Sequence, residues 1–209
     1  MSIRLYGWPQ STASRVRWAL EELGVGYDYV ELDPKKGENR TPEYLAISPT
    51  GKVPGLVDGG QAYFESAAII LHLGEVYGRE RNLWPAADTA RAAAVCWMVW
   101  GTTELHAYHM QWLYHGMDTI VSYAAEGRSK AAADYNHGQH LRNLDALEAR
   151  LAGRDYILGA AFSLADIPAA SSLLIGQDIG VRVDGRQNVD AWLARCRARP
   201  ALARAGGPG

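Results

Sequence analysis

The chain has 209 residues, enough for one or two domains with a sizeable core, and its 48% hydrophobic and 21% charged residues are ordinary for a globular protein. Its 21 Lys and Arg residues nearly balance 23 Asp and Glu residues, so the charge does not indicate binding to nucleic acid or to an anionic membrane. The longest apolar run, at 92–100, is well short of a membrane span, and the N-terminus lacks the pattern of a secretory signal.

The N-terminal part of the chain alternates between strand-like and helix-like patterns. A short apolar segment at 3–6 is typical of a strand. The segment 14–23 carries its large apolar side chains at helical spacing and is followed by Gly24, a common helix stop. The alternation at 27–32 then predicts a half-buried strand.

The next segments continue this alternation. Thr41 followed by Pro42 is typical of a helix start. The strand-like segments 55–57 and 62–64 flank Asp58-Gly59-Gly60, whose glycines suit a hairpin turn, and a helix is predicted at 67–77. The resulting order β-α-β-α-β-β-α is that of a thioredoxin-like domain, which we predict for residues 1–79.

The second half of the chain is predicted to be all-helical. Residues 80–88 are polar and irregular and are interpreted as a linker. Strand signals almost disappear over 89–209, which we assign to a helical domain. Helices are expected at 89–115, 129–151, 163–174 and 189–198. The terminal residues 205–209 are expected to fray.

Two short motifs in the first domain carry the chemical information. The first is Gly51-Lys52-Val53-Pro54, in which a proline that cannot donate to a sheet precedes an apolar strand. The second is Glu65-Ser66, which places a carboxylate and a hydroxyl at the start of a helix, beside unpaired backbone N–H groups. Together they could hold both ends of a zwitterionic amino-acid group beside an open strand edge.

This arrangement resembles the glutathione site of the cytosolic glutathione S-transferase family. That family carries a cis-proline after Val-Pro and a Glu-Ser-x-x-Ile signature, which corresponds here to 65–69. The helical half adds a second resemblance, because 163–167 has the form of the capping box found in the family's helical domain. The segment 188–201 also resembles the family's closing helix.

The resemblance implies a thioredoxin-like domain followed by an all-helical domain, in a cytoplasmic homodimer of the serine-type, theta- or phi-like bacterial class. It implies that the protein binds reduced glutathione and activates the thiolate for attack on a hydrophobic electrophile, as in detoxification. Glutathione-dependent dehalogenation, reduction or ether cleavage share the first half-reaction and stay open. A non-catalytic glutathione-binding or ligand-binding module is the remaining alternative.

The thiolate needs a hydrogen-bond donor. A free thiol has a pKa of about 8.5, and lowering it by about two units takes roughly 2.7 kcal/mol of preferential thiolate stabilisation. By resemblance, Ser11 falls where the theta-like and phi-like classes keep their catalytic serine. Tyr6 is the competing choice, Thr12 is a spare donor, and Ser14 is expected to be the N-cap of the first helix.

The cysteine distribution argues against disulfide chemistry. No cysteine lies in the loop around Ser11, which disfavours thiol–disulfide exchange through a protein cysteine and a zeta-class isomerase activity. Cys96 lies in an apolar helical run and is expected in the core. Cys196 is far from it in sequence, so we expect no disulfide and a reducing compartment.

The resemblance also assigns the glutathione contacts. It implies that Glu65 pairs with the γ-glutamyl ammonium and that Ser66 binds the γ-glutamyl carboxylate, although Glu-Ser before a helix taken alone would more often be simple capping. It implies that the backbone of Val53, left open by a cis Pro54, bonds the cysteinyl part.

The contact with the glycine carboxylate is less defined. Lys52 and Asn39 are the candidates. Asn39 falls where some relatives have a histidine, and a lysine in a turn is usually just solvated. Both interpretations of Lys52 stay open.

An electrophile pocket is expected against the first long helix of the second domain. Trp97, Trp100, Glu104 and Tyr108 share one face of that helix, as their spacing of three or four residues requires. Such a face lines a pocket, or else it belongs to the core or a subunit interface. The histidines nearby have no second ligand at a metal-binding spacing, so no metal site is expected.

Overall fold

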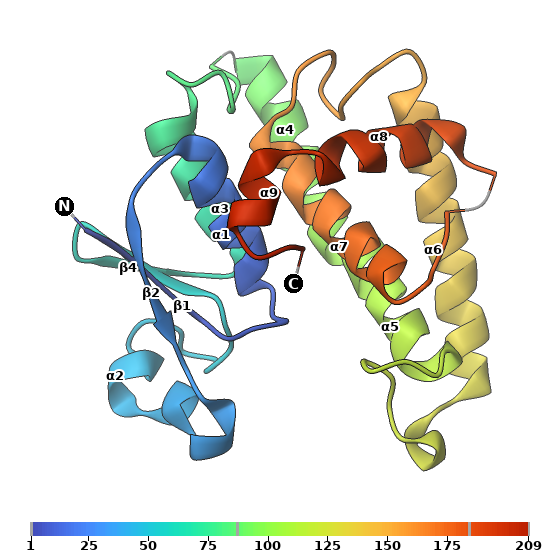
Figure 1. Cartoon of the computed structure of the whole chain (residues 1–209), viewed down its shortest axis with the longest axis horizontal. Coiled ribbons are helices and arrows are strands. Elements are labelled where there is room, and N and C mark those ends of the chain that lie inside the picture. The colour runs from blue at the N-terminus through green and yellow to red at the C-terminus, as the bar shows by residue number, and fades with distance from the viewer. Residues whose placement is uncertain (1, 87, 184, 209) are drawn as a thin grey trace. The chain divides into compact units, whose positions relative to one another are not determined.

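The computed structural model describes residues 2–86, 88–183 and 185–208. Its contacts divide the chain into two compact units (Figure 1). The N-terminal unit comprises Met1–Asp88 together with Arg199–Gly209, and the helical unit comprises Thr89–Ala198. The last residues of the chain therefore pack with the N-terminal unit, whereas the sequence-based division placed them in the helical domain. The exact ends of the predicted linker stay a prediction, and its Ala87 lies outside the described residues.

A four-stranded mixed sheet forms the centre of the N-terminal unit. Its strands are β1 (Ile3–Gly7), β2 (Tyr27–Glu31), β3 (Gly55–Asp58) and β4 (Gln61–Phe64), in the spatial order β2-β1-β3-β4. β2 is parallel to β1, whereas β3 is antiparallel to both β1 and β4. The predicted thioredoxin-like order is confirmed.

Three α-helices alternate with these strands: α1 (Ala13–Leu23), the short α2 (Pro42–Leu45) and α3 (Ser66–Leu73), which continues into a π-helical turn at Gly74–Gly78. Two 3-10 turns, at Pro34–Lys36 and Glu38–Arg40, precede α2. α1 and α3 pack against each other on the same side of the sheet (Figure 1). The apolar faces of both helices are buried there. Removal of these side chains from water is the main term that stabilises the packing.

The predicted turn and cap residues act as expected. Gly24 ends α1 with a φ of 60°, and the Thr41 side chain accepts a hydrogen bond from the Tyr44 N–H at the start of α2. Gly59 and Gly60 have φ values of 58° and 88° in the hairpin turn. Each of these residues supplies the conformation or acceptor that the local backbone needs.

The predicted N-cap of α1 is wrong. The helix begins at Ala13, and the Ser14 hydroxyl donates to the Pro208 carbonyl at 2.5 Å. The Ala13 N–H instead bonds the Ser11 Oγ at 3.3 Å, and the Ser14 N–H bonds the Ser11 carbonyl. Ser11 therefore satisfies the first amides of the helix, which leaves Ser14 free to bind the chain terminus.

The C-terminal segment packs on α1 and is ordered through Pro208. A short helix, α9 (Pro200–Arg204), was not predicted from the sequence; it contacts α1, and Ala205 is fully buried behind it. Arg199 and Arg204 pair with consecutive glutamates of α1, at 2.6 Å and 2.9 Å. The expected fraying is therefore wrong for 205–208, and Gly209 lies outside the described residues.

The helical unit contains five α-helices within the part of the chain that the structure describes. They are α4 (Asp88–Trp100), α5 (His106–Gly116), α6 (Lys130–Leu151), α7 (Ile167–Asp178) and α8 (Gln187–Arg197). A 3-10 turn at Ala125–Gly127 precedes α6, and another at Leu164–Asp166 precedes α7. The predicted helices are present, with boundaries that shift by a few residues.

The first long helix has a π-helical segment at Gly101–Leu105, between α4 and α5. Two features accompany this segment. Gly101 lies so close to α7 that an added Cβ would be 3.1 Å from the Ala169 backbone nitrogen. The hydroxyls of Thr102 and Thr103 also bond the carbonyls four residues back, and such bonds compete with regular helix geometry.

The predicted capping box is confirmed. The Asp166 carboxylate accepts hydrogen bonds from the N–H of Ser163 at 2.9 Å, the N–H of Ile157 at 2.8 Å and the indole N–H of Trp192 at 3.0 Å. Because Asp166 is fully buried, these donors are what make its carboxylate tolerable in the core. Its role is structural.

The expected burial of Cys96 is wrong, because this residue is exposed on α4 while Cys196 is buried. Neither cysteine is in a disulfide. Cys96 lies on the same helical face as Ala92 and Val99, which are exposed too. An apolar run that is apolar all round cannot show from the sequence alone which of its faces turns outward.

Candidate functional site

The register of the sheet brings three loops to one end of the N-terminal unit. Tyr6 of β1 pairs with Gly55 of β3, and Gly55 pairs in turn with Phe64 of β4. Three segments therefore meet at this end of the sheet: the loop after β1, Val53-Pro54 before β3, and Glu65-Ser66 after β4. The two sequence motifs and the serine loop thus meet through ordinary strand pairing.

The loop that carries the first motif has a fixed shape. The Val53–Pro54 peptide bond is cis, as expected from the resemblance. Gly51 has a φ of 64°, and an added Cβ would lie 2.8 Å from the Asn39 carbonyl oxygen. Only glycine fits this position without strain, because other residues rarely adopt this φ and the neighbouring backbone leaves no room.

Three side chains hold this loop in place. The hydroxyls of Tyr44 and Ser48 both donate to the Lys52 carbonyl at 2.8 Å. The Asn39 amide donates to the Gly51 carbonyl at 2.7 Å. Burial raises the pKa of Tyr44 to about 12, so its hydroxyl stays protonated and remains a donor at physiological pH.

Only one of the two main-chain polar groups of Val53 has a hydrogen-bond partner in the described structure. Its carbonyl accepts a hydrogen bond from the Thr12 hydroxyl at 3.2 Å, which ties the start of α1 to the cis-proline loop. Its N–H has no hydrogen-bond partner within the described parts of the chain. A half-buried N–H of this kind is a donor available to a bound molecule.

Glu65 and Ser66 also present unused polar groups. Glu65 is exposed and has a φ of 67° and a ψ of 121°, a backbone conformation that is strained for a residue other than glycine. Ser66 is only 5% exposed and is the first residue of α3. Neither side chain has a partner among the residues that the structure describes. Strain retained beside unpaired polar groups is typical of a ligand site.

The serine loop places its hydroxyl at the start of α1. The Ser11 Oγ donates to the Trp8 carbonyl at 2.6 Å and accepts from the Ala13 N–H. The competing Tyr6 lies at the end of β1, with its ring 5.8 Å from that of Tyr44. A group bound here would lie near the positive end of the helix dipole.

The residues predicted for the glycine carboxylate differ in their surroundings. Lys52 is exposed, so its ammonium group is open to solvent. Asn39 is only 7% exposed, and its amide is already bonded to Gly51, while its Oδ1 is buried without a partner in the described structure. The proposed contacts of both residues stay predictions.

Comparisons with known proteins agree with this geometry. The family model of the glutathione S-transferase N-terminal domain matches residues 1–75, and that of the C-terminal domain matches 109–200. Glutathione S-transferase 3 of Zea mays is 34% identical, covering 96% of this chain and 91% of its own. The chain belongs to the glutathione S-transferase family.

Solved structures of family members share the whole fold. A theta class glutathione S-transferase from Xanthomonas axonopodis pv. citri, solved with glutathione bound, is 31% identical with a TM-score of 0.84 over 98% of this chain and 96% of that one. A glutathione transferase from Burkholderia graminis with two glutathione molecules bound per subunit is 28% identical, with a TM-score of 0.83 over 98% and 87%. The glutathione transferase fold predicted from the sequence is therefore confirmed.

In this family member, three of the four residues predicted to line the electrophile pocket contact α6. The ring centroids of Trp97 and Trp100 are 5.1 Å apart, and the Trp100 indole donates to Asn143 at 3.2 Å. The Arg150 guanidinium lies over the Trp97 ring at 5.3 Å. The ring centroid of Tyr108 lies 6.3 Å from that of Tyr135 on α6. Glu104 is exposed. These rings take part in packing the helical unit, and their role toward an electrophile stays a prediction.

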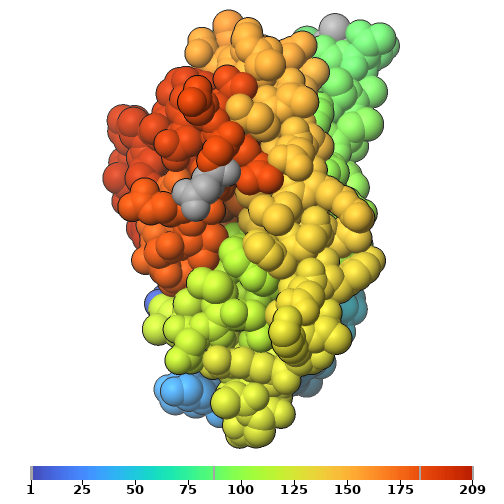
Figure 2. All heavy atoms as spheres, turned by 90° about the vertical axis from the view of Figure 1, so that its right-hand side faces the viewer, coloured from blue at the N-terminus to red at the C-terminus, as the bar shows by residue number. Residues whose placement is uncertain are grey.

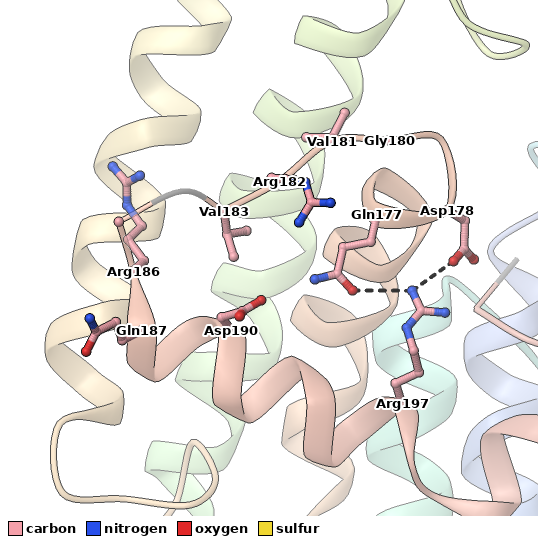
Figure 3. Close-up of a pocket in the computed structure, with 11 residues that line it drawn as sticks. Gln177, Asp178, Gly180, Val181, Arg182, Val183, Arg186, Gln187, Asp190 and Arg197 are labelled. Carbon is pink, nitrogen blue, oxygen red and sulfur yellow. Dashed lines mark hydrogen bonds and ion pairs between the residues drawn. The ribbon is translucent and has the colours of Figure 1, made fainter.

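Sequence reasoning did not find the hollows of the helical unit, of which two border the segment between α7 and α8. The larger, of about 510 Å³, lies between the end of α7, the following segment and α8 (Figure 3). Arg197 of α8 bonds Gln177 at 3.3 Å and Asp178 at 2.8 Å across it. The smaller lies between α5, α6 and the same segment, which Figure 2 shows beside α6. Their walls come from residues far apart in sequence, so no local motif marks them.

Two further searches were made of residues 2–86, 88–183 and 185–208. In these ranges, no three His, Cys, Asp or Glu side chains are arranged to hold a metal ion. Every helix there is too short or too polar to cross a membrane.

Proposed function

We propose that this chain is a serine-type, theta- or phi-like glutathione transferase that binds reduced glutathione in its N-terminal unit and activates the thiol through Ser11. In this proposal, Val53 bonds the cysteinyl backbone and Glu65 pairs with the γ-glutamyl ammonium. Ser66 binds the γ-glutamyl carboxylate. The relatives that have glutathione bound support this proposal, because they share the fold over nearly the whole chain.

One observation carries the proposal. Strand register sets the Val53 N–H, the Glu65 carboxylate and the Ser66 hydroxyl at the same end of the hairpin, and none of the three has a partner in the described structure. A donor, an anion and a second donor in this order match the charges and amide groups along the γ-glutamyl-cysteinyl part of glutathione. Unpaired polar groups kept at one place are costly unless a ligand or water completes them.

The chemistry follows from the position of Ser11. A hydroxyl that donates to sulfur stabilises the thiolate more than the thiol, and the N-terminus of α1 adds a favourable dipole. The hydroxyl now bonds the Trp8 carbonyl, so binding the sulfur means exchanging that neutral acceptor for a charged one. Hydrogen bonds to charged groups are the stronger kind, which favours the exchange.

The reaction is nucleophilic displacement or addition. The thiol proton leaves to solvent, the thiolate attacks the electrophilic carbon, a C–S bond forms and, in a displacement, the leaving group departs with its electron pair. Dehalogenation, reduction and ether cleavage begin with the same attack. Product analysis on an aryl halide, an alkyl halide and an aryl ether would distinguish them.

The assembly and location are proposed on the same basis. Apolar side chains are exposed in each unit, with Phe64 and Val76 at 41% and 56% and Val99 at 44%. Such surface supports a homodimer, whose mass light scattering would measure. The family resemblance and two cysteines that lie far apart in sequence support a reducing, cytoplasmic location and a role in detoxification.

Glutathione binding can be tested by calorimetry. We expect saturable binding of reduced glutathione that Glu65→Gln weakens by about ten- to a hundredfold, because a charged hydrogen bond contributes roughly 1.5–3 kcal/mol. Glu43→Gln is the matched control, since Glu43 is an exposed glutamate of the same unit, on α2. Absence of binding by the unaltered chain, or equal affinities for the two variants, would reject the proposed site.

A further inference from the structure

The loop between β1 and α1 contains a residue in a backbone conformation that its residue type rarely adopts. Gln10 has a φ of 60° and is one of three non-glycine residues with a positive φ in the part of the chain that the structure describes. Glu65, at the proposed glutathione site, and Asn82 are the other two. Apart from glycine, this left-handed region is occupied mainly by asparagine and aspartate, whose short side chains can bond the local backbone.

The side chain of Gln10 does not explain this conformation. It is exposed, and it makes no hydrogen bond, ion pair or ring contact with any residue that the structure describes. Glutamine is also too long to bond the local backbone as asparagine does. The strain is therefore imposed by the chain on either side of the residue.

Both ends of this loop are fixed by packing. Gly7, the last residue of β1, lies so close to α1 that an added Cβ would be 2.4 Å from the Cβ of Ala13, the first residue of that helix. Both residues are buried. The Gly7 carbonyl also accepts a hydrogen bond from the Leu32 N–H at 2.9 Å. Residues 8–12 therefore have to turn the chain between two points that packing holds together.

The middle of the loop is a turn with Pro9 and Gln10 at its centre. The proline ring fixes the first of these two residues at a φ of about −65°. A positive φ at the second is typical of the type II turn, in which glycine is the preferred residue. Because Pro9 and the packed ends leave the loop little freedom, Gln10 takes the strained conformation.

This turn separates the two hydrogen-bond partners of the Ser11 hydroxyl. The hydroxyl donates to the Trp8 carbonyl, before the turn, at 2.6 Å. It accepts from the Ala13 N–H, at the start of α1, at 3.3 Å. A change in the φ of Gln10 rotates the peptide groups between Trp8 and Ser11, so the hydroxyl moves relative to its partners. The position of the Ser11 Oγ thus depends on the backbone of Gln10.

We propose that Gln10 is a positioning residue for the thiol-activating serine: its left-handed backbone holds the Ser11 hydroxyl where the thiol of glutathione is bound. This inference rests on the proposed function, because it takes Ser11 as the donor to the sulfur. Misplacement of a catalytic group by about 1 Å can lower a rate about a hundredfold. A strained conformation is retained where it fixes such a group.

The role of the backbone is tested with Gln10→Val, because a β-branched residue is poorly suited to a positive φ. We expect kcat for conjugation with 1-chloro-2,4-dinitrobenzene to fall about tenfold and the pKa of the bound thiol to rise by about one unit, which is the same factor. The affinity for glutathione, measured by calorimetry, should change less than about threefold, because Gln10 supplies none of the contacts proposed for glutathione. Gln10→Gly adopts the same φ without strain and should keep kcat and the thiol pKa of the unaltered protein.

Asn82→Val is the matched control. Asn82 has a φ of 57° and is exposed like Gln10, but it follows the π-helical turn at Gly74–Gly78 and lies outside the loops of the proposed glutathione site. Both valine variants should lower the melting temperature to a similar extent, because each places a β-branched residue at a positive φ. Only Gln10→Val should change kcat and the pKa of the bound thiol.

The outcomes distinguish this inference from the proposed function. If the unaltered protein does not lower the pKa of bound glutathione below that of the free thiol, the proposed activation fails and the inference fails with it. If the unaltered protein lowers that pKa and Gln10→Val matches it in kcat and in thiol pKa, only the positioning role is wrong. The role is also wrong if Gln10→Gly or Asn82→Val loses as much rate as Gln10→Val.

Discussion

The proposed glutathione site and the buried pair His109 and His140 of the helical unit are built on opposite principles. The glutathione site uses main-chain groups and exposed side chains at the open end of a sheet, where strand register brings the Val53 and Glu65 motifs together. The histidine pair lies on α5 and α6 with ring centroids 4.7 Å apart, and three of its ring nitrogens are buried without a hydrogen-bond partner in the described structure. The first depends on backbone shape, and the second depends on packing and on what is left unpaired inside it.

This difference decides how each region responds to solvent conditions. The Glu65 carboxylate is exposed, so its charge costs little in the free protein. His109 and His140 are buried, so charging them is unfavourable as long as the helical unit is folded. Acid should therefore affect the two units differently.

The largest expected effect is a loss of stability on acidification. An unfolded histidine has a pKa of about 6.5, whereas His109 and His140 titrate near 4 and 2 in the folded state. Between these values the unfolded chain binds more protons than the folded chain, so the free energy of unfolding falls as the pH is lowered. From pH 7 to pH 5 we expect each imidazole to contribute a loss of about 2 kcal/mol, measured by urea unfolding.

The control for this prediction is the difference between variants, because other groups titrate in the same window. His140→Phe should lose about 2 kcal/mol less than the unaltered protein over that pH range, since one of the two imidazoles is gone. His115→Phe replaces a histidine that is not fully buried and should leave the loss unchanged. Equal pH dependence of His140→Phe and the unaltered protein would show that His140 is already paired or charged in the folded state.

The next effect concerns catalysis in the N-terminal unit. Ser11→Ala should lower the rate of conjugation with 1-chloro-2,4-dinitrobenzene about a hundredfold near neutral pH, while glutathione affinity changes less than about threefold. The pKa of the bound thiol should rise by about two units without its donor, which corresponds to roughly 2.7 kcal/mol. The deficit should therefore shrink as the pH is raised toward the pKa of the free thiol.

Ser14→Ala is the matched control for Ser11, because the Ser14 hydroxyl is bonded to the Pro208 carbonyl. It should leave both the rate and the pH profile unchanged. Unchanged turnover of Ser11→Ala would instead move the catalytic assignment to Tyr6 or Thr12, both of which lie at the same end of β1 or α1.

The contrast between the two regions also explains what the sequence could predict. The hairpin turn and the capping box around Asp166 were predictable, because each depends on residue types at fixed local spacing, whereas the cis Val53-Pro54 bond was expected from the family resemblance. The position of Ser14 and the burial of Cys96 were predicted wrongly, since both are decided by distant packing. The histidine pair left no signal at all, because its two residues meet only after α5 and α6 have packed.

The smallest expected effect tests the link between the two halves of the glutathione site. The Thr12 hydroxyl bonds the Val53 carbonyl over a sequence separation of 41 residues, and we interpret Thr12 as a positioning residue. Thr12→Val keeps the shape but removes the donor. A neutral hydrogen bond contributes about 1 kcal/mol, so we expect the KM for glutathione to rise about fivefold while kcat stays within about twofold. Thr12→Ser should restore the KM, because it returns the hydroxyl. A lower kcat together with a raised pKa of the bound thiol would show instead that Thr12 donates to the sulfur, and Ser11 would then be the residue that only caps α1.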